Sequence, residues 1–217
     1  MGSTPHRIPE HRWPVAFAIA LAMAIYLFLP GLFHVLPSWV VPVIALALYL
    51  PLIALNPHRL GRETSWSRAL GSVIAVGLAL VNQVYLAQIV HELLNGRGVG
   101  VEIIYTAAGI WVTNVIAFGV LFWEIDRGGP YARWFGGERL RPTDFRFPQE
   151  DGSPGTDPEW RPLFFDYLFT SLTAMTAFSP TDVMPLTRRA KALLGYEALT
   201  GFVLLALVIA RAVNILD

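Results

Sequence analysis

The chain has 217 residues, of which 54% are hydrophobic and 15% charged, and its 16 basic side chains balance its 16 acidic ones. A soluble domain carries about 25% charged residues, so this composition excludes most soluble proteins and favours a membrane protein. The lack of cysteine in the sequence excludes disulfide scaffolds and thiol nucleophiles, and the neutral charge balance argues against nucleic acid as a partner.

The apolar residues are gathered in five blocks, each near the roughly 20 residues that a helix needs to cross a bilayer. Four of the blocks contain no Asp, Glu, Lys or Arg, and the last is interrupted by Glu197, Arg211 and Asn214. The sequence therefore predicts an all-α membrane protein with five transmembrane helices. The blocks are Val15 to Leu36, Trp39 to Leu55, Ala69 to Val90, Ile103 to Trp123 and Ala192 to Leu216.

The first block follows a weakly basic start, Arg7 and Arg12, as a secretory signal would. It is longer than the apolar part of a signal peptide and no small-residue cleavage site follows it, so we expect a retained helix. Lys and Arg are frequent in the tail 1–13 and in the connection 56–68, and short loops rich in these residues stay in the cytoplasm. This bias predicts a multi-pass protein of the plasma (bacterial inner) membrane with a cytoplasmic N-terminus.

The predicted organisation has four parts. The cytoplasmic tail 1–13 precedes four transmembrane helices in 14–124, a polar loop occupies 125–162, and 163–217 holds a re-entrant helix, a filter-like turn and the last span. Counting four spans forward returns the polar loop to the cytoplasm. We expect a structured loop with a flexible middle, because this segment is too short and too poor in apolar residues to bury a core of its own.

Leu163 to Phe178 is a sixth apolar segment, roughly 24 Å long as a helix, whereas the hydrocarbon core is about 30 Å thick. Pro180 in the following Ser179-Pro180-Thr181-Asp182 ends the helix. A half-membrane helix, an irregular polar segment and a full span favour a re-entrant element. The alternatives are an amphipathic helix flat at the interface and a tilted full span. On a helical wheel Asp166, Thr170, Thr173 and Thr176 share one side, and Phe164, Leu168, Leu172 and Met175 the other.

The run from Asp166 to Pro185 resembles the pore helix and filter of two-helix potassium channels. In that family a threonine-rich helix leads to Thr-Val-Gly-Tyr-Gly-Asp, a hydrophobic pair and Pro, and Asp182 and Pro185 match the aspartate and the proline. The resemblance implies an oligomeric pore, tetrameric in that family, for monovalent cations. Ser and Thr replace both filter glycines, so potassium selectivity is not carried over. The candidate pore and filter residues are Thr173, Thr176, Ala177, Phe178, Ser179, Pro180, Thr181 and Asp182.

Three of these residues have more than one interpretation. Thr173 and Thr176 either offer their hydroxyls to an ion or bond back to their own helix. Asp182 either forms a ring of carboxylates in an oligomer, or it caps the last helix or pairs with Arg188. In potassium channels the pore loop enters from outside, whereas the charge bias here keeps the polar loop inside. We favour an inverted loop, as in glutamate-receptor channels, over the alternative that one of the first four blocks does not span.

Five stretches resemble, over nearly the whole chain, a family of uncharacterised multi-span bacterial membrane proteins. This resemblance supports the span count and implies no particular activity. The stretches are Trp123 to Pro130, Asp144 to Gln149, Trp160 to Pro162, Thr176 to Asp182 and Ala210 to Leu216.

Polar side chains inside the predicted spans are further candidates. Glu197 and Arg211 lie about 21 Å apart along one helix and cannot pair, so Glu197 must face another helix, another subunit or water. His91-Glu92 begins a zinc-protease motif, but Asn95 stands where the second histidine is required, so no metal is expected. The intramembrane polar candidates are Asn82, Gln88, Glu92, Asn114 and Glu197.

The leading hypothesis is an oligomeric, channel-like membrane protein that conducts monovalent cations without strict potassium selectivity. The alternative is a non-conducting scaffold or sensor subunit with a collapsed pore loop, which Pro180 and the missing glycines favour. We expect no enzyme activity, because the sequence has no nucleophile elbow, paired catalytic histidines or phosphate-binding glycine loop. No cofactor is expected, and the expected partners are the lipid bilayer, monovalent cations and further copies of the chain.

Overall fold

The computed structural model describes residues 10–29, 65–95, 102–135, 142–152, 160–176 and 183–216, together with positions 39, 43, 47, 155 and 157. The protein is mostly helical. The α-helices are α1 (Trp13–Phe28), α3 (Ser65–Asn95), α4 (Glu102–Ile125), α5 (Pro130–Phe135), α6 (Phe164–Thr176) and α7 (Arg188–Leu216). The shorter elements are the 3₁₀ helices η1 (Asp126–Gly128) and η3 (Pro148–Asp151) and the strands β1 (Phe145–Arg146) and β2 (Met184–Pro185).

Among the described residues, three stretches of helix are long and apolar enough to cross a membrane, namely Ala69–Asn95, Ile104–Gly128 and Arg188–Val213. At 1.5 Å per residue each is about 40 Å long, which exceeds the roughly 30 Å of a hydrocarbon core. Length and composition therefore indicate a multi-pass membrane protein. The three helical stretches correspond to the third, fourth and fifth predicted blocks. The second block, Trp39 to Leu55, lies outside the described residues except for positions 39, 43 and 47.

The first predicted block forms the shorter helix α1, which has 16 residues. Pro14 lies in the first turn, where its missing N–H group costs nothing. The helix ends at Phe28, and Leu29 is already extended, with φ −61° and ψ 131°. Leu29 precedes a proline, and a residue in that position is driven away from helical geometry. The described helix is thus about 24 Å long, shorter than a hydrocarbon core.

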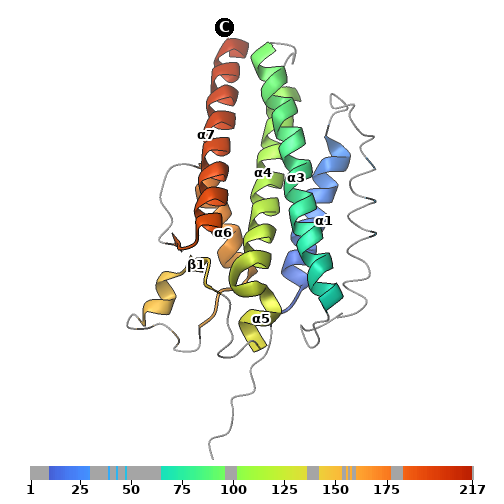
Figure 1. Cartoon of the computed structure of the whole chain (residues 1–217). Coiled ribbons are helices and arrows are strands. Elements are labelled where there is room, and N and C mark those ends of the chain that lie inside the picture. Colours follow the sequence, from blue (N-terminus) through green and yellow to red (C-terminus); the bar gives the residue numbers. More distant parts are fainter. Residues whose placement is uncertain are drawn as a thin grey trace, which may run out of the picture.

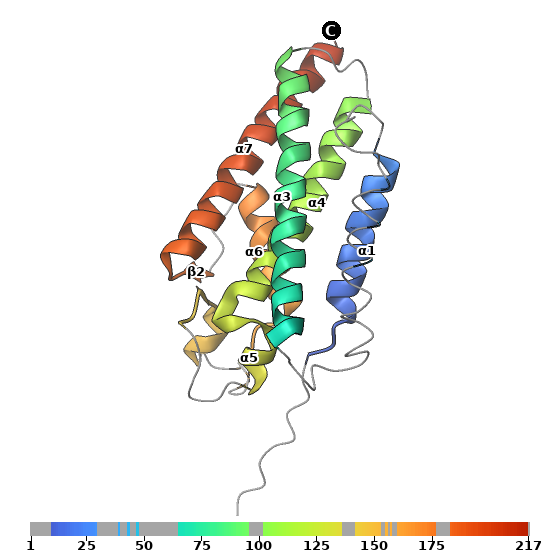
Figure 2. The ribbon, with the colours of Figure 1, turned by 45° about the vertical axis from the view of Figure 1, so that its right-hand side comes forward.

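The long helices lie side by side, with α7 at one edge, α1 at the other, and α3 and α4 between them (Figures 1 and 2). Two contacts fix the direction of α3 against α4. Asn82 near the middle of α3 bonds to Asn114 near the middle of α4. Gly71 near the start of α3 faces Glu124 near the end of α4. The two helices are therefore antiparallel.

Helix α6 is short and lies beside one half of α4 and α7 (Figures 1 and 2). Phe164 at its start packs edge-on against Trp123 near the end of α4, with ring centroids 6.2 Å apart. Met175 near its end accepts a hydrogen bond from Asn114 in the middle of α4. Its 13 residues, about 20 Å of helix, therefore run antiparallel to α4 along half its length.

Two glycines let α6 lie directly on the backbones of both neighbours. A Cβ atom on Gly119 of α4 would lie 3.1 Å from Cα of Leu168. One on Gly201 of α7 would lie 2.8 Å from Cα of Met175. Because Ser171 contacts Glu197 and Met175 contacts Gly201, α6 and α7 run parallel and start from the same end of the bundle.

That end carries a polar cap, the name used here for η1, α5, β1, η3 and β2. Strands β1 and β2 pair antiparallel, with Phe145 opposite Pro185. Phe145 packs against Phe122 of α4 at 4.9 Å between ring centroids, and Phe147 packs against Tyr167 of α6 at 5.3 Å. Phe145 and Phe147 of the predicted polar loop are thus buried in the core of the helix bundle.

Candidate functional site

Asp126, fully buried just beyond α4, is the centre of the polar cap. Its Oδ1 atom accepts hydrogen bonds from the backbone N–H groups of Asp144 at 2.8 Å and Phe145 at 3.3 Å. Its Oδ2 atom accepts a hydrogen bond from the hydroxyl of Tyr167 at 2.6 Å. One carboxylate thereby joins the end of α4 to the cap and to α6.

The chain leaves α4 through three residues with positive φ, Arg127 at 53°, Gly128 at 84° and Gly129 at 99°. Glycine adopts this backbone at little cost, whereas Arg127 is strained there by roughly 1–2 kcal/mol. An ion pair with Glu150 of η3 holds the Arg127 side chain. The Gly-Gly pair is therefore what allows the chain to turn back under α4.

Arg133 of α5 binds carbonyl groups at the carboxyl end of α4. Its Nη1 atom donates to the carbonyl oxygens of Trp123 at 2.6 Å and Asp126 at 3.0 Å. Its guanidinium group lies over the rings of Trp123 and Tyr167, 5.7 and 4.9 Å from their centroids. A cation at this place satisfies the last carbonyl groups of a helix and complements its dipole.

Two more acids hold α6 and α7 in place, since Asp144 joins α7 to the cap and Glu10 joins the start of α6 to the end of α4. Asp144, fully buried, accepts hydrogen bonds from Thr187 and from Nε of Arg189, the latter at 2.7 Å. Glu10, ahead of α1, accepts hydrogen bonds from Nε1 of Trp123 at 3.0 Å and from the backbone N–H of Phe164 at 2.6 Å. Burial raises the pKa of Glu10 above its usual value, against the lowering effect of these hydrogen bonds.

A polar network lies at the level where α6 ends. Asn82 accepts hydrogen bonds from the hydroxyls of Tyr26 and Thr113, both at 2.7 Å. Its amide group donates to Oδ1 of Asn114 at 2.6 Å. Asn114 donates in turn to the sulfur of Met175 at 3.1 Å. Helices α1, α3, α4 and α6 are thus joined by hydrogen bonds near the middle of α4.

Gln83 extends this network to the last helix. Its amide group donates to Oδ1 of Asn114 at 2.8 Å, and its Oε1 atom accepts from the hydroxyl of Tyr196 at 2.9 Å. The structure therefore brings together the predicted candidates Asn82 and Asn114. Interhelical hydrogen bonds inside a membrane contribute roughly 0.6–2 kcal/mol each, so the network fixes how the helices pack.

Glu197, the intramembrane acid, faces α6 one turn below this network. The side chain is fully buried and contacts the hydroxyl of Ser171, which also lies 2.8 Å from the carbonyl oxygen of Val115. Of the alternatives considered for Glu197, the structure gives it a neighbouring helix in the same chain. A buried acid, a serine and a backbone carbonyl thus meet where α4, α6 and α7 touch.

The other candidates have different surroundings. The hydroxyl of Thr173 lies 2.9 Å from the carbonyl oxygen of Phe169 and 3.0 Å from that of Thr170, either of which can accept its hydrogen, and Thr176 donates to the carbonyl oxygen of Thr173 at 2.9 Å. Both hydroxyls bond back to their own helix. The filter residues Ala177, Phe178, Ser179, Pro180, Thr181 and Asp182 lie outside the described residues.

Gln88 and Glu92 are half-buried on α3, about two and three turns beyond Asn82 respectively, and take no part in the network. The Oε1 atom of Gln88 has no hydrogen-bond partner among the described residues. The described residues contain no group of His, Cys, Asp or Glu that could hold a metal ion.

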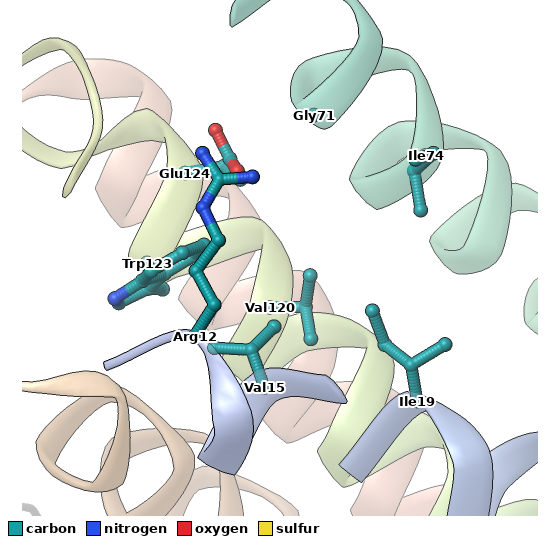
Figure 3. Close-up of a pocket in the computed structure, with 8 residues that line it drawn as sticks. All are labelled: Arg12, Val15, Ile19, Gly71, Ile74, Val120, Trp123 and Glu124. Atoms are coloured by element: carbon teal, nitrogen blue, oxygen red, sulfur yellow. The ribbon is translucent and has the colours of Figure 1, made fainter. Parts of the chain in front are cut away.

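A small pocket opens between the starts of α1 and α3 and the end of α4 (Figure 3). The Arg12 guanidinium and the Glu124 carboxylate point toward each other at one side of it (Figure 3). A Cβ atom on Gly71 would lie 2.7 Å from Oε1 of Glu124, so this glycine makes room for the acid. The remaining lining residues are Val15, Ile19, Ile74, Val120 and Trp123.

Several of these residues were not predicted as site residues from the sequence. Tyr26, Ser171 and Tyr196 are ordinary residues of apolar helices, and their partners lie 56, 26 and 113 positions away. The cap offered a signal, since Asp126 and Asp144 fall in two of the stretches that carry the resemblance to bacterial membrane proteins. Comparison with known proteins adds nothing further, because no family model, curated protein or solved structure matches the chain.

Proposed function

We propose that the protein is a channel-like integral membrane protein of the bacterial inner membrane, in which α4, α6 and α7 form a pore-loop unit. Copies of the chain assemble around a pathway for monovalent cations, without strict potassium selectivity. The observation that carries the proposal is the half-length helix α6, which packs between two helices long enough to cross a membrane.

The path of the chain around α6 supports a re-entrant element. The helix starts at the polar end, beside Trp123, and stops near Asn114 and Gly201, close to the middle of α4 and α7. The chain is back at the polar end by Met184, because β2 pairs with β1. Both contacts favour a re-entrant element over a tilted full span or a helix flat on the surface.

The direction of α6 suits a cation. The carboxyl end of a helix carries about half a negative charge, and this end of α6 points toward the middle of the bundle. The filter residues 177–182, with the carboxylate of Asp182, follow there in sequence. Pore-loop channels use the same combination of a short helix and a polar turn.

The distribution of basic residues supports a cytoplasmic polar end. Among the described residues, Arg211 is the one Lys or Arg that lies toward the opposite end of the bundle. By the positive-inside rule, this distribution favours a cytoplasmic location for the polar cap and the N-terminus. The pore loop enters from that side, as in the inverted topology.

A non-conducting scaffold or sensor subunit is the second candidate, and one observation favours it. The outward face of α6 is apolar, with Phe165 72% and Phe169 52% exposed, while the hydroxyls of Thr173 and Thr176 are used within the helix. In this alternative α6 serves only to complete the helix bundle, and the loop that follows α6 forms no pathway for ions.

Cation flux into liposomes, measured with the purified full-length protein, tests the proposal. We expect K⁺ and Na⁺ flux above that of protein-free liposomes, and a lower flux in Asp182→Asn. Asp157→Asn, which removes an acid from the exposed loop, is the matched control and should keep the flux of the parent protein. A monomer in native mass spectrometry that carries no flux would reject the channel and leave the scaffold.

A further inference from the structure

The hydroxyl of Ser171 faces two hydrogen-bond acceptors but has one hydrogen to donate. The hydroxyl oxygen of Ser171 lies within hydrogen-bond distance of both Oε1 of Glu197 and the carbonyl oxygen of Val115. A serine hydroxyl has a single hydrogen, and a carbonyl oxygen can only accept. If Ser171 donates to Val115, the second contact needs a hydrogen from Glu197.

The two hydrogen bonds of Ser171 cannot both form when Glu197 is ionised. Ser171 would have to choose one of two acceptors, which leaves the other oxygen facing a lone pair. The Oε2 atom of Glu197 is buried and has no hydrogen-bond partner among the described residues. A carboxylate with a bare oxygen inside a membrane protein is strongly disfavoured, whereas a neutral acid can leave its second oxygen unpaired at far lower cost.

The charged and titratable groups of the packed elements either pair with groups other than Glu197 or lie at other levels of the bundle. On α6, Asp166 accepts from the N–H of Leu163, and Tyr167 donates to Asp126. On α7, Tyr196 donates to Gln83, Arg189 pairs with Asp144, and Lys191 lies six residues, about 9 Å, before Glu197. The groups on α4 and α3 lie toward the helix ends or beyond the network, namely Glu102, Tyr105, Glu124, Tyr85, His91 and Glu92.

We propose that Glu197 and Ser171 form a proton-binding site, in which the neutral acid donates to Ser171, Ser171 donates to Val115, and α6 is thereby fastened to α4 and α7. Loss of the proton to water removes the donor on Glu197 and leaves two acceptors for one serine hydrogen. The contact beside Gly201 then loosens, and water reaches the end of α6. The site belongs to the proposed pore-loop unit, but its protonation does not depend on whether the unit conducts.

Infrared spectroscopy of the full-length protein in lipid bilayers tests the protonation directly. At neutral pH we expect a carbonyl band of a protonated carboxylic acid that is lost in Glu197→Gln. Ser171→Ala removes the hydroxyl that Glu197 donates to, so the same band should move to higher wavenumber. Glu102→Gln, an exposed acid at the start of α4, is the matched control and should leave the band unchanged.

Hydrogen exchange of the α6 amides tests the fastening. When pH rises through the transition of the infrared band, exchange in 164–176 should become about tenfold faster than in Glu197→Gln at the same pH, which corresponds to about 1.4 kcal/mol of opening free energy. A spectrum of the parent protein with only carboxylate bands at neutral pH overturns the proton site, whatever the flux measurement gives. Equal exchange in the two proteins above that pH overturns the fastening.

Discussion

Replacing Gly201 by alanine tests whether α6 lies against α7 as closely as the structure has it. The new Cβ atom would lie 2.8 Å from Cα and 3.0 Å from the carbonyl carbon of Met175, and it would also meet the carbonyl oxygen of that residue. These are backbone atoms, which cannot turn aside as a flexible side chain can. The whole end of α6 must therefore move, and overpacking of this kind costs about 1–3 kcal/mol.

Gly195→Ala on the same helix is the matched control, because a Cβ atom there meets nothing within 4 Å. Alanine in place of glycine favours a helix by about 0.5–1 kcal/mol, and this gain is common to both variants. The difference between them should therefore be the overpacking cost, with Gly201→Ala less stable by about 1–3 kcal/mol in reversible unfolding from mixed micelles. Hydrogen exchange should show faster opening of 164–176 in Gly201→Ala alone. Equal stability and equal exchange of the two variants would refute the close contact between α6 and α7.

Three other outcomes follow from the site. Asn114→Leu should lower the unfolding free energy by about 1–3 kcal/mol, because it leaves amide groups of Asn82 and Gln83 unpaired. Gln88→Leu, the control, should change the unfolding free energy by less than about 0.5 kcal/mol. A similar loss in both variants would contradict the network. Asp144→Ala should cost about 1–3 kcal/mol, while Arg146→Ala, which breaks an exposed ion pair, should cost less than about 1 kcal/mol in the same unfolding assay. Because the pKa of Glu10 is raised in the folded protein, the unfolded chain releases the Glu10 proton at lower pH than the folded protein does. The melting temperature should therefore fall as pH rises from about 4.5 through the pKa of Glu10 in the folded protein. This pH dependence should be absent in Glu10→Gln.

The sequence predicted the long helices well because they depend on composition alone. A charge-free run such as 69–90 must leave water, and a helix satisfies its own backbone hydrogen bonds while doing so. The half-length segment before the last span was also recognisable, since Pro180 and the polar residues around it interrupt the apolar run. The described helix, Phe164–Thr176, lies within the predicted segment Leu163 to Phe178, and residues 177 and 178 lie outside the described residues.

The face that α6 buries could not be predicted from its helical wheel. The wheel separated threonines from apolar residues, yet Thr170 and Ser171 are buried with Phe164, Tyr167 and Met175, while Phe165 and Phe169 are exposed. Amphipathicity ranks side chains against water, but in a bundle with lipid outside it the polar side chains turn inward. Ser171 is buried because Val115 and Glu197 offer it hydrogen bonds, and such partners are set by the neighbouring helices.

The cap shows the same limit over longer distances in the chain. Asp126, Asp144 and Glu10 become the fastening points of α6 and α7 through partners that lie up to 154 positions away. The stretch Trp123 to Pro130 holds the end of α4 and the turn that follows it. It does not reveal that Arg133 and Tyr167 close over that end, because no local rule connects these positions.

The place of α6 between α4 and α7 also sets the order in which the molecule can be completed. A ribosome delivers α4 first, α6 next and α7 last, so half of the surface that α6 needs does not yet exist when α6 emerges. Gly201 and Glu197, which receive it, are made about 20–40 residues later. Until α7 emerges, the face that α6 later turns toward it is uncovered. Helix α6 can therefore take its final place only after α7 has been made.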